Sequence, residues 1–111
     1  MLKNNVSIMY VGGVDTGRIL TKHARQRGWH VFHPAETMEA LAMHVFYYPD
    51  IVVIDRSEFP IMAAEVAQHL RSLNDETPML EVVALDAQAV LDLVEGTLET
   101  FTQTATTASS D

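Results

Sequence analysis

The stretch from Tyr48 to Asp55 limits the fold of this chain more than any other part of it. Pro49 and Asp50 open it as a turn, and four β-branched residues, Ile51–Ile54, follow without a polar break. A strand that is apolar on both faces is typical of a parallel sheet covered by helices on both sides. The run ends at Asp55, at the C-terminal end of the strand, where open α/β sheets gather ligands and chemistry. Asp55 is therefore either a working residue or a solvated strand end.

Strand and helix patterns alternate on both sides of this stretch. The sequence predicts strands at 6–11, 29–33 and 80–85, and helices at 15–27, 36–47 and 61–73. In the second helix the residues expected to face the core are Met38, Leu41, Ala42, Val45 and Phe46. Alternation of this kind indicates parallel strands joined by right-handed crossovers. The predicted fold class is α/β, a doubly wound parallel sheet of four or five strands in three layers, α/β/α.

The final third of the chain has two interpretations. Asp86 could cap a helix that ends at Gly96, and a fifth strand would then cover residues 97–103, because threonine and phenylalanine favour strands. Alternatively, the helix continues through Gly96 and adds Leu98 and Phe101 to its apolar stripe. We favour the strand. The domain is then expected to span residues 1–103, with a disordered polar tail at 104–111.

Composition excludes several classes of function. The formal net charge is −8, which repels phosphate backbones, so we expect no direct binding of nucleic acid. The chain has no cysteine, which excludes disulfides, a thiolate nucleophile and a cysteine-based zinc site. Its apolar runs are too short to span a membrane, and no apolar signal-peptide core follows the N-terminus. These features are compatible with a cytoplasmic protein.

Several short segments carry a family resemblance. They are Pro49–Asp55, Arg18 with Leu20 after the first strand, Ala40–Leu41, and Val83–Ala87. In this order and spacing the chain resembles a response-regulator receiver domain, the flavodoxin-like module of two-component signalling. The resemblance covers residues 6–87 well and 88–103 loosely. It implies a cytoplasmic signalling module that acts through a protein partner.

The resemblance also implies a phosphorylation pocket, of which few parts remain. The phosphoacceptor position is Asp55, but the two positions for Mg²⁺-binding acids are Gly12 and Gly13. The Ser or Thr expected after the fourth strand is Asp86, whose charge would repel a phosphoryl group. The lysine after the fifth strand would be Gln103. The loop after the acceptor is Glu58-Phe59-Pro60, one residue longer than the family's usual Met-Pro.

These departures predict a degenerate, non-catalytic receiver with Asp55 as a vestigial acceptor and no resident cofactor. Asp15 could supply one oxygen to a weakly bound Mg²⁺, a poor substitute for a pair of acids when the ion demands near-octahedral geometry. If Asp86 lies near Asp55, two close carboxylates would also disfavour added negative charge. No pair of the five histidines has a metal-binding spacing, so we expect no metal site.

Two other functions stay open. One is a phosphorylatable receiver that uses Asp55 in a rebuilt pocket. The other is a small-ligand or phosphate-binding domain at the Gly12–Gly13 turn. Because no closing helix follows the expected fifth strand, we also expect poor cover of the sheet near the fourth strand. An apolar surface of that kind favours a homodimer or a covering segment of a longer protein.

Overall fold

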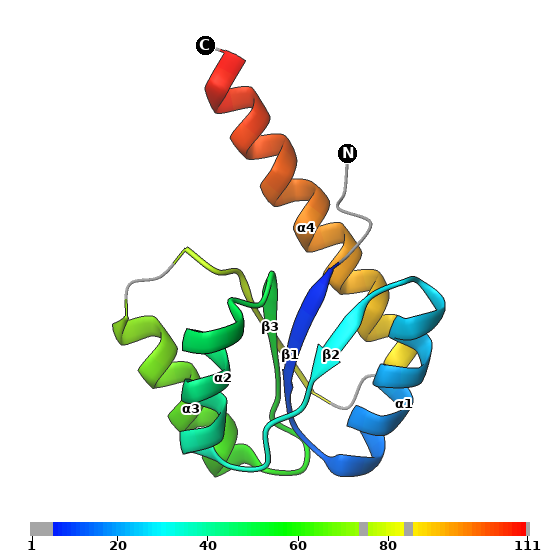
Figure 1. The fold of residues 1–111 in the computed structure, drawn as a ribbon, viewed down its shortest axis with the longest axis vertical. Helices are drawn as coiled ribbons and strands as arrows, with labels where there is room; N and C mark the ends of the chain where they lie inside the picture. The colour runs from blue at the N-terminus through cyan, green and yellow to red at the C-terminus, as the bar shows by residue number, and fades with distance from the viewer. Residues whose placement is uncertain (1–5, 74–75, 84–85, 111) are drawn as a thin grey trace.

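The computed structural model describes residues 6–73, 76–83 and 86–110. Strands and helices alternate along the chain: β1 Ser7–Val11, α1 Val14–Gln26, β2 His30–Phe32, α2 Thr37–Tyr47, β3 Ile51–Asp55, α3 Pro60–Ser72, β4 Met79–Val82 and α4 Ala87–Ser110 (Figure 1). Within these described segments no helix combines the length and apolarity needed to cross a membrane. The predicted elements up to β4 are confirmed, with ends that shift by a few residues.

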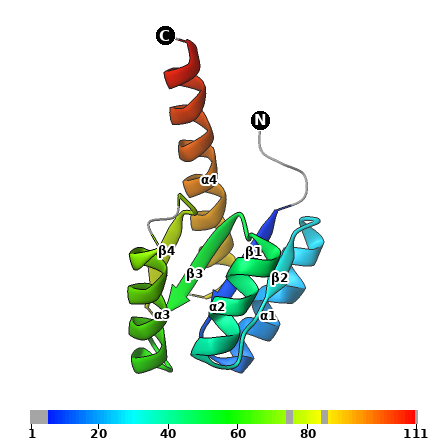
Figure 2. The ribbon, with the colours of Figure 1, turned by 60° about the vertical axis from the view of Figure 1, so that its left-hand side comes forward.

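The strands form one parallel sheet in the order β2-β1-β3-β4 (Figure 2). In the two central strands Ile8 pairs with Ile51 and Val11 with Ile54, so their C-terminal ends lie level. All five residues of β3 are buried. This confirms the predicted α/β class and the flavodoxin-like three-layer architecture, with four strands.

Two apolar cores lie on opposite faces of the sheet, and alternate residues of β1 and β3 supply both. Ile8 and Tyr10 of β1 point to the side covered by α1 and α4, whereas Met9 and Val11 point to the side covered by α2 and α3. Figure 1 shows the sheet between these two helical layers. This arrangement explains why the central strands lack the alternation of a half-exposed sheet.

The predicted strand at 97–103 is wrong, because α4 runs without a break from Ala87 to Ser110. The side chains of Val90, Leu91, Val94 and Leu98 recur at helical spacing and are buried beside α1 and β4. Burial of this stripe outweighs the strand preference of the threonines. The helical alternative is confirmed for the backbone and for Leu98, whereas the side chain of Phe101 lies outside the described residues; Gln103 ends no strand. We expected a disordered tail from residue 104, and the bounds of α4 include residues 104–110. The disorder of this segment stays a prediction.

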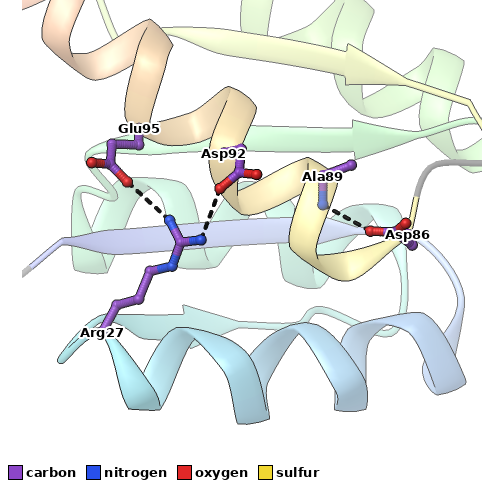
Figure 3. A network of polar contacts seen from close by, with 5 residues as sticks. All are labelled: Arg27, Asp86, Ala89, Asp92 and Glu95. Atoms are coloured by element: carbon purple, nitrogen blue, oxygen red, sulfur yellow. Dashed lines mark hydrogen bonds and ion pairs between the residues drawn. The ribbon is translucent and has the colours of Figure 1, made fainter.

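Helix α4 covers one face of the sheet near β4, which we expected to be poorly covered, but β4 remains the edge strand of the described sheet and Val83 after it is 61% exposed. Val82 of β4 is buried in the same core as Ala87 and Val90. Arg27, at the end of α1, holds the outer side of α4 through ion pairs of 2.9 Å to Asp92 and 3.0 Å to Glu95 (Figure 3). Helices α1 and α4 are therefore joined by buried apolar side chains and by the ion pairs of Arg27 with two carboxylates.

The predicted inward face of α2 is wrong except at Leu41, which packs against the core. Met38, Ala42, Val45 and Phe46 are exposed, Phe46 by 77%, while Ala40 and His44 are buried. Apolar side chains occur on more than one side of this helix, so their spacing did not define which side meets the sheet. The small Ala40 lies against the sheet, Leu41 and Met43 pack at the edge of the core, and Met38, Val45 and Phe46 remain exposed.

Candidate functional site

The candidate site lies at the C-terminal ends of β1 and β3. Because Val11 pairs with Ile54, the residue that follows it, Gly12, lies beside Asp55. The side chain of Tyr10 reaches the same point from within β1. The structure therefore brings together three predicted positions, Gly12, Gly13 and Asp55, and adds Tyr10 to them.

Both carboxylate oxygens of Asp55 accept hydrogen bonds from the protein. The Tyr10 hydroxyl donates to Oδ2 at 2.7 Å, and the Ser57 backbone N–H donates to Oδ1 at 2.9 Å. The Ser57 hydroxyl donates to the same Oδ1. Asp55 is only 3% exposed. A buried carboxylate is stable when its oxygens are satisfied in this way, and this one is satisfied without a ligand.

Tyr10 is the buried partner that the sequence analysis missed. Its side chain is fully buried, and burial, the hydrogen bond to Asp55 and the charge of Asp55 together raise the pKa of its hydroxyl well above the usual value. The phenol therefore stays protonated and acts as a donor throughout the physiological range. A signal was available: Tyr10 is the one residue with a polar tip among the aliphatic and thioether side chains that end β1.

Close approach explains Gly12 at the turn, whereas Gly13 lies against one flexible side chain. A Cβ on Gly12 would lie 2.9 Å from Cβ of Asp55 and would also meet the Tyr10 hydroxyl. A Cβ on Gly13 would collide with the carboxylate of Glu58, which comes from the loop after β3. A side chain at either position would displace its neighbours. The space where the resemblance places a pair of acids is thus occupied by a phenol and by one carboxylate.

His33 closes the site on the β2 side. Its Nε2 lies 3.0 Å from the carbonyl oxygen of Gly12, and because a carbonyl only accepts, Nε2 carries the donated proton. The ring lies 5.5 Å from the Tyr10 ring and passes over Gly17 of α1, where a Cβ would meet it at 2.8 Å. His33 therefore separates the Tyr10–Asp55 pair from the outer surface of α1.

The remaining predicted positions have other surroundings. Asp15 lies exposed in the first turn of α1. Asp86 precedes α4, and its Oδ1 accepts a hydrogen bond of 2.8 Å from the Ala89 N–H (Figure 3), which is the contact of an N-terminal helix cap. The predicted capping role of Asp86 is confirmed. Gln103 lies within α4, and its side chain is outside the described residues.

For the Mg²⁺ that the resemblance implies, the carboxylates that the structure describes at this edge are those of Asp55 and Glu58. Mg²⁺ is usually held by one or two carboxylates that keep room for several waters. Asp55 is buried and both its oxygens already accept hydrogen bonds, whereas Gly12 and Gly13 offer no side-chain oxygen. In the described parts of the chain no three histidine, aspartate or glutamate side chains converge as metal ligands would.

Comparison with known proteins gives a likeness of fold. No protein-family model matches the chain, and no curated protein sequence matches it. Among solved structures, the chain is similar to the receiver domain of Francisella response regulator 1452, with a TM-score of 0.61 and 20% identity over 73% of this chain and 68% of that one.

Two further solved structures are similar. The chemotaxis response regulator CheY4 of Vibrio cholerae has a TM-score of 0.67 and 15% identity, over 81% of this chain and 96% of that one. A fusion that contains part of the yeast Spc42 trimeric coiled coil has a TM-score of 0.73 and 13% identity, over 93% and 83%. The parallel sheet, its strand order and these similarities together show that this chain has the fold of a response-regulator receiver domain.

Proposed function

We propose that this chain is a receiver-like signalling module that acts by binding another protein, without enzymatic activity and without accepting a phosphoryl group on Asp55. The observation that carries this proposal is that the Asp55 carboxylate is buried and accepts hydrogen bonds at both oxygens. A phosphoacceptor must present a free carboxylate oxygen to the incoming phosphorus atom. Here Tyr10 and Ser57 donate hydrogen bonds to the two oxygens, and the side chain is 3% exposed, so an incoming phosphorus atom has little access to either oxygen.

The charge around Asp55 also supports the proposal. Phosphoryl transfer needs cations to neutralise the charge that develops on the transferred group. The described hydrogen-bond partners of Asp55 are Tyr10 and Ser57, which are neutral, and the neighbouring Gly13 lies against the carboxylate of Glu58 rather than against a cation. The phenol of Tyr10 takes the position of a hydrogen-bond donor but carries no positive charge.

The exposed side of α2 supports the part of the proposal that concerns a partner. Met38 and Phe46 are 71% and 77% exposed, and Tyr48, which caps the helix in a left-handed conformation with φ of 48°, is 77% exposed. Large apolar side chains gathered on one element are typical of interaction surfaces. We propose a protein of a signalling pathway as the partner, with a second copy of this chain as the alternative.

A titration with Mg²⁺ and beryllofluoride, followed by two-dimensional amide NMR, tests the proposal. We expect no localised shifts at Gly12, Gly13 or Asp55, because the carboxylate is already satisfied. Asp55→Asn is the matched control, since the amide keeps the shape of the side chain and removes the acceptor charge. Shifts at these residues that vanish in the control would show a working phosphorylation pocket and favour the alternative of a phosphorylatable receiver.

A further inference from the structure

A groove runs along the outer side of α1, on the far side of His33 from Asp55. Its volume is about 500 Å³, within the range of small-molecule sites. Seven residues line it: Val14, Gly17, Arg18, Thr21, Lys22, Arg25 and His33. From Val14 to Arg25 the helix rises by about 17 Å, so the groove suits an elongated ligand.

Three cations of this groove have no carboxylate partner among the residues that the structure describes. Arg18, Lys22 and Arg25 follow one another at i, i+4 and i+7, so their side chains share one side of α1. Over the described ranges of the chain none of the three forms an ion pair, and no carboxylate lines the groove. By contrast, Arg27 and Arg56 are each paired with carboxylates.

This concentration of positive charge is unusual for the chain that carries it. The whole sequence has seven lysines and arginines against fifteen acids, and three of the seven line this one groove. Uncompensated cations that share a concave surface create a local positive potential. The groove therefore has the opposite sign to the molecule as a whole and selects for an anion.

The N-terminal end of the groove is aromatic and apolar. Gly17 is buried and has no side chain, which leaves room for the ring of His33. The hydrogen bond from Nε2 to the Gly12 carbonyl holds that ring in one orientation. Val14, 56% exposed, completes this end. A flat organic group can pack here while its charged part extends towards Arg25.

We propose that this groove binds a small organic polyphosphate, with two or more phosphate groups along Arg18, Lys22 and Arg25 and its flat organic part against Val14 and His33. The site is on the flank of α1 and does not use the Gly12–Gly13 turn, where the Glu58 carboxylate would repel a phosphate. Because the three cations are exposed, binding should weaken as salt screens their charge.

Calorimetric titration of the full chain with ATP, ADP, tripolyphosphate and adenosine tests this proposal. We expect ATP to bind with a Kd below about 1 mM at low salt, and adenosine to bind much more weakly. Each of R18Q, K22Q and R25Q should lower the affinity by about threefold to fivefold, and the triple variant by more than about 30-fold. In two-dimensional amide NMR spectra, the shifts caused by ATP should centre on α1 and His33.

R56Q is the matched control, because it removes one arginine that lies outside the groove; it should leave the ATP affinity unchanged. Unchanged melting temperatures of the ligand-free variants would show that all of them fold. If tripolyphosphate bound as tightly as ATP, the proposed contact of an organic group with Val14 and His33 would be wrong, and the groove would recognise the phosphate chain alone. Equal binding by wild type and the triple variant, no binding by any phosphate compound, or preference for a single-stranded oligonucleotide would overturn the proposal.

Discussion

Helices α4 and α2 cover opposite faces of the same sheet in opposite ways. In α4 the large side chains, such as Leu91 and Leu98, are buried, and the outer side carries acids that pair with Arg27. In α2 the buried residue nearest the strands is the small Ala40, and the large Phe46 faces solvent. Both faces of the sheet are buried, but the helix on one face turns its large apolar side chains inward, whereas α2 leaves several of its own exposed.

Replacing Leu91 with alanine tests the buried side of α4 and should lower the free energy of unfolding more than any other substitution proposed here. Leu91 is fully buried between α4 and the sheet, so the substitution leaves a cavity, and we expect a loss of about 3 kcal/mol in the free energy of unfolding. Leu93→Ala is the matched control, because Leu93 is on the same helix and is 43% exposed; it should cost well under half as much. Urea unfolding measures both. Equal losses for the two would mean that α4 does not bury the stripe described above.

Tyr10→Phe tests the buried hydrogen bond between Tyr10 and Asp55 on the α1 and α4 side of the sheet. Without the phenol, Oδ2 of Asp55 loses its donor, and we expect a loss of about 2 kcal/mol at neutral pH. Tyr47→Phe is the control, since Tyr47 is 57% exposed. A change no larger than that of the control would show that the Tyr10–Asp55 hydrogen bond does not stabilise the fold.

The raised pKa of Tyr10 gives the same variant a signature in pH. The folded protein holds the phenolic proton more tightly than the unfolded chain, so the stabilisation is complete below pH of about 10. Above that pH the unfolded chain ionises first, and stability should fall by about 1.4 kcal/mol for each pH unit until the folded pKa is reached. Denaturant titrations at several alkaline pH values should show this slope in wild type and a reduced slope in Tyr10→Phe.

Phe46→Gln addresses the other side of the comparison and should have the smallest effect on stability. Phe46 is 77% exposed, so we expect the free energy of unfolding to change by less than about 0.5 kcal/mol. If the apolar side of α2 holds a second copy of the chain, the same substitution should weaken self-association in sedimentation velocity. A monomeric wild-type chain at high micromolar concentration would exclude the homodimer and leave a different protein as partner.

The sequence by itself determined the sheet and the position of its functional end. A run of β-branched residues such as Ile51–Ile54 is stable only with both faces covered, and the alternation of strands and helices then leaves a parallel order. Asp55 was placed at the C-terminal end of β3 by the same pattern, and the structure agrees. These features follow from local periodicity, which a single chain displays directly.

Only the tertiary structure decided how the helices are turned and how the site is closed. Helix α2 carries apolar residues on more than one side, so their spacing alone did not identify the side on which Ala40 and His44 are buried. Residues 97–103 favour strand locally, yet the buried stripe of α4 extends through Leu98 and keeps them helical. Tyr10 and Asp55 are far apart in sequence, and their hydrogen bond exists because β1 and β3 pair in one register. Burial and long-range pairing are properties of the folded chain, and local pattern does not contain them.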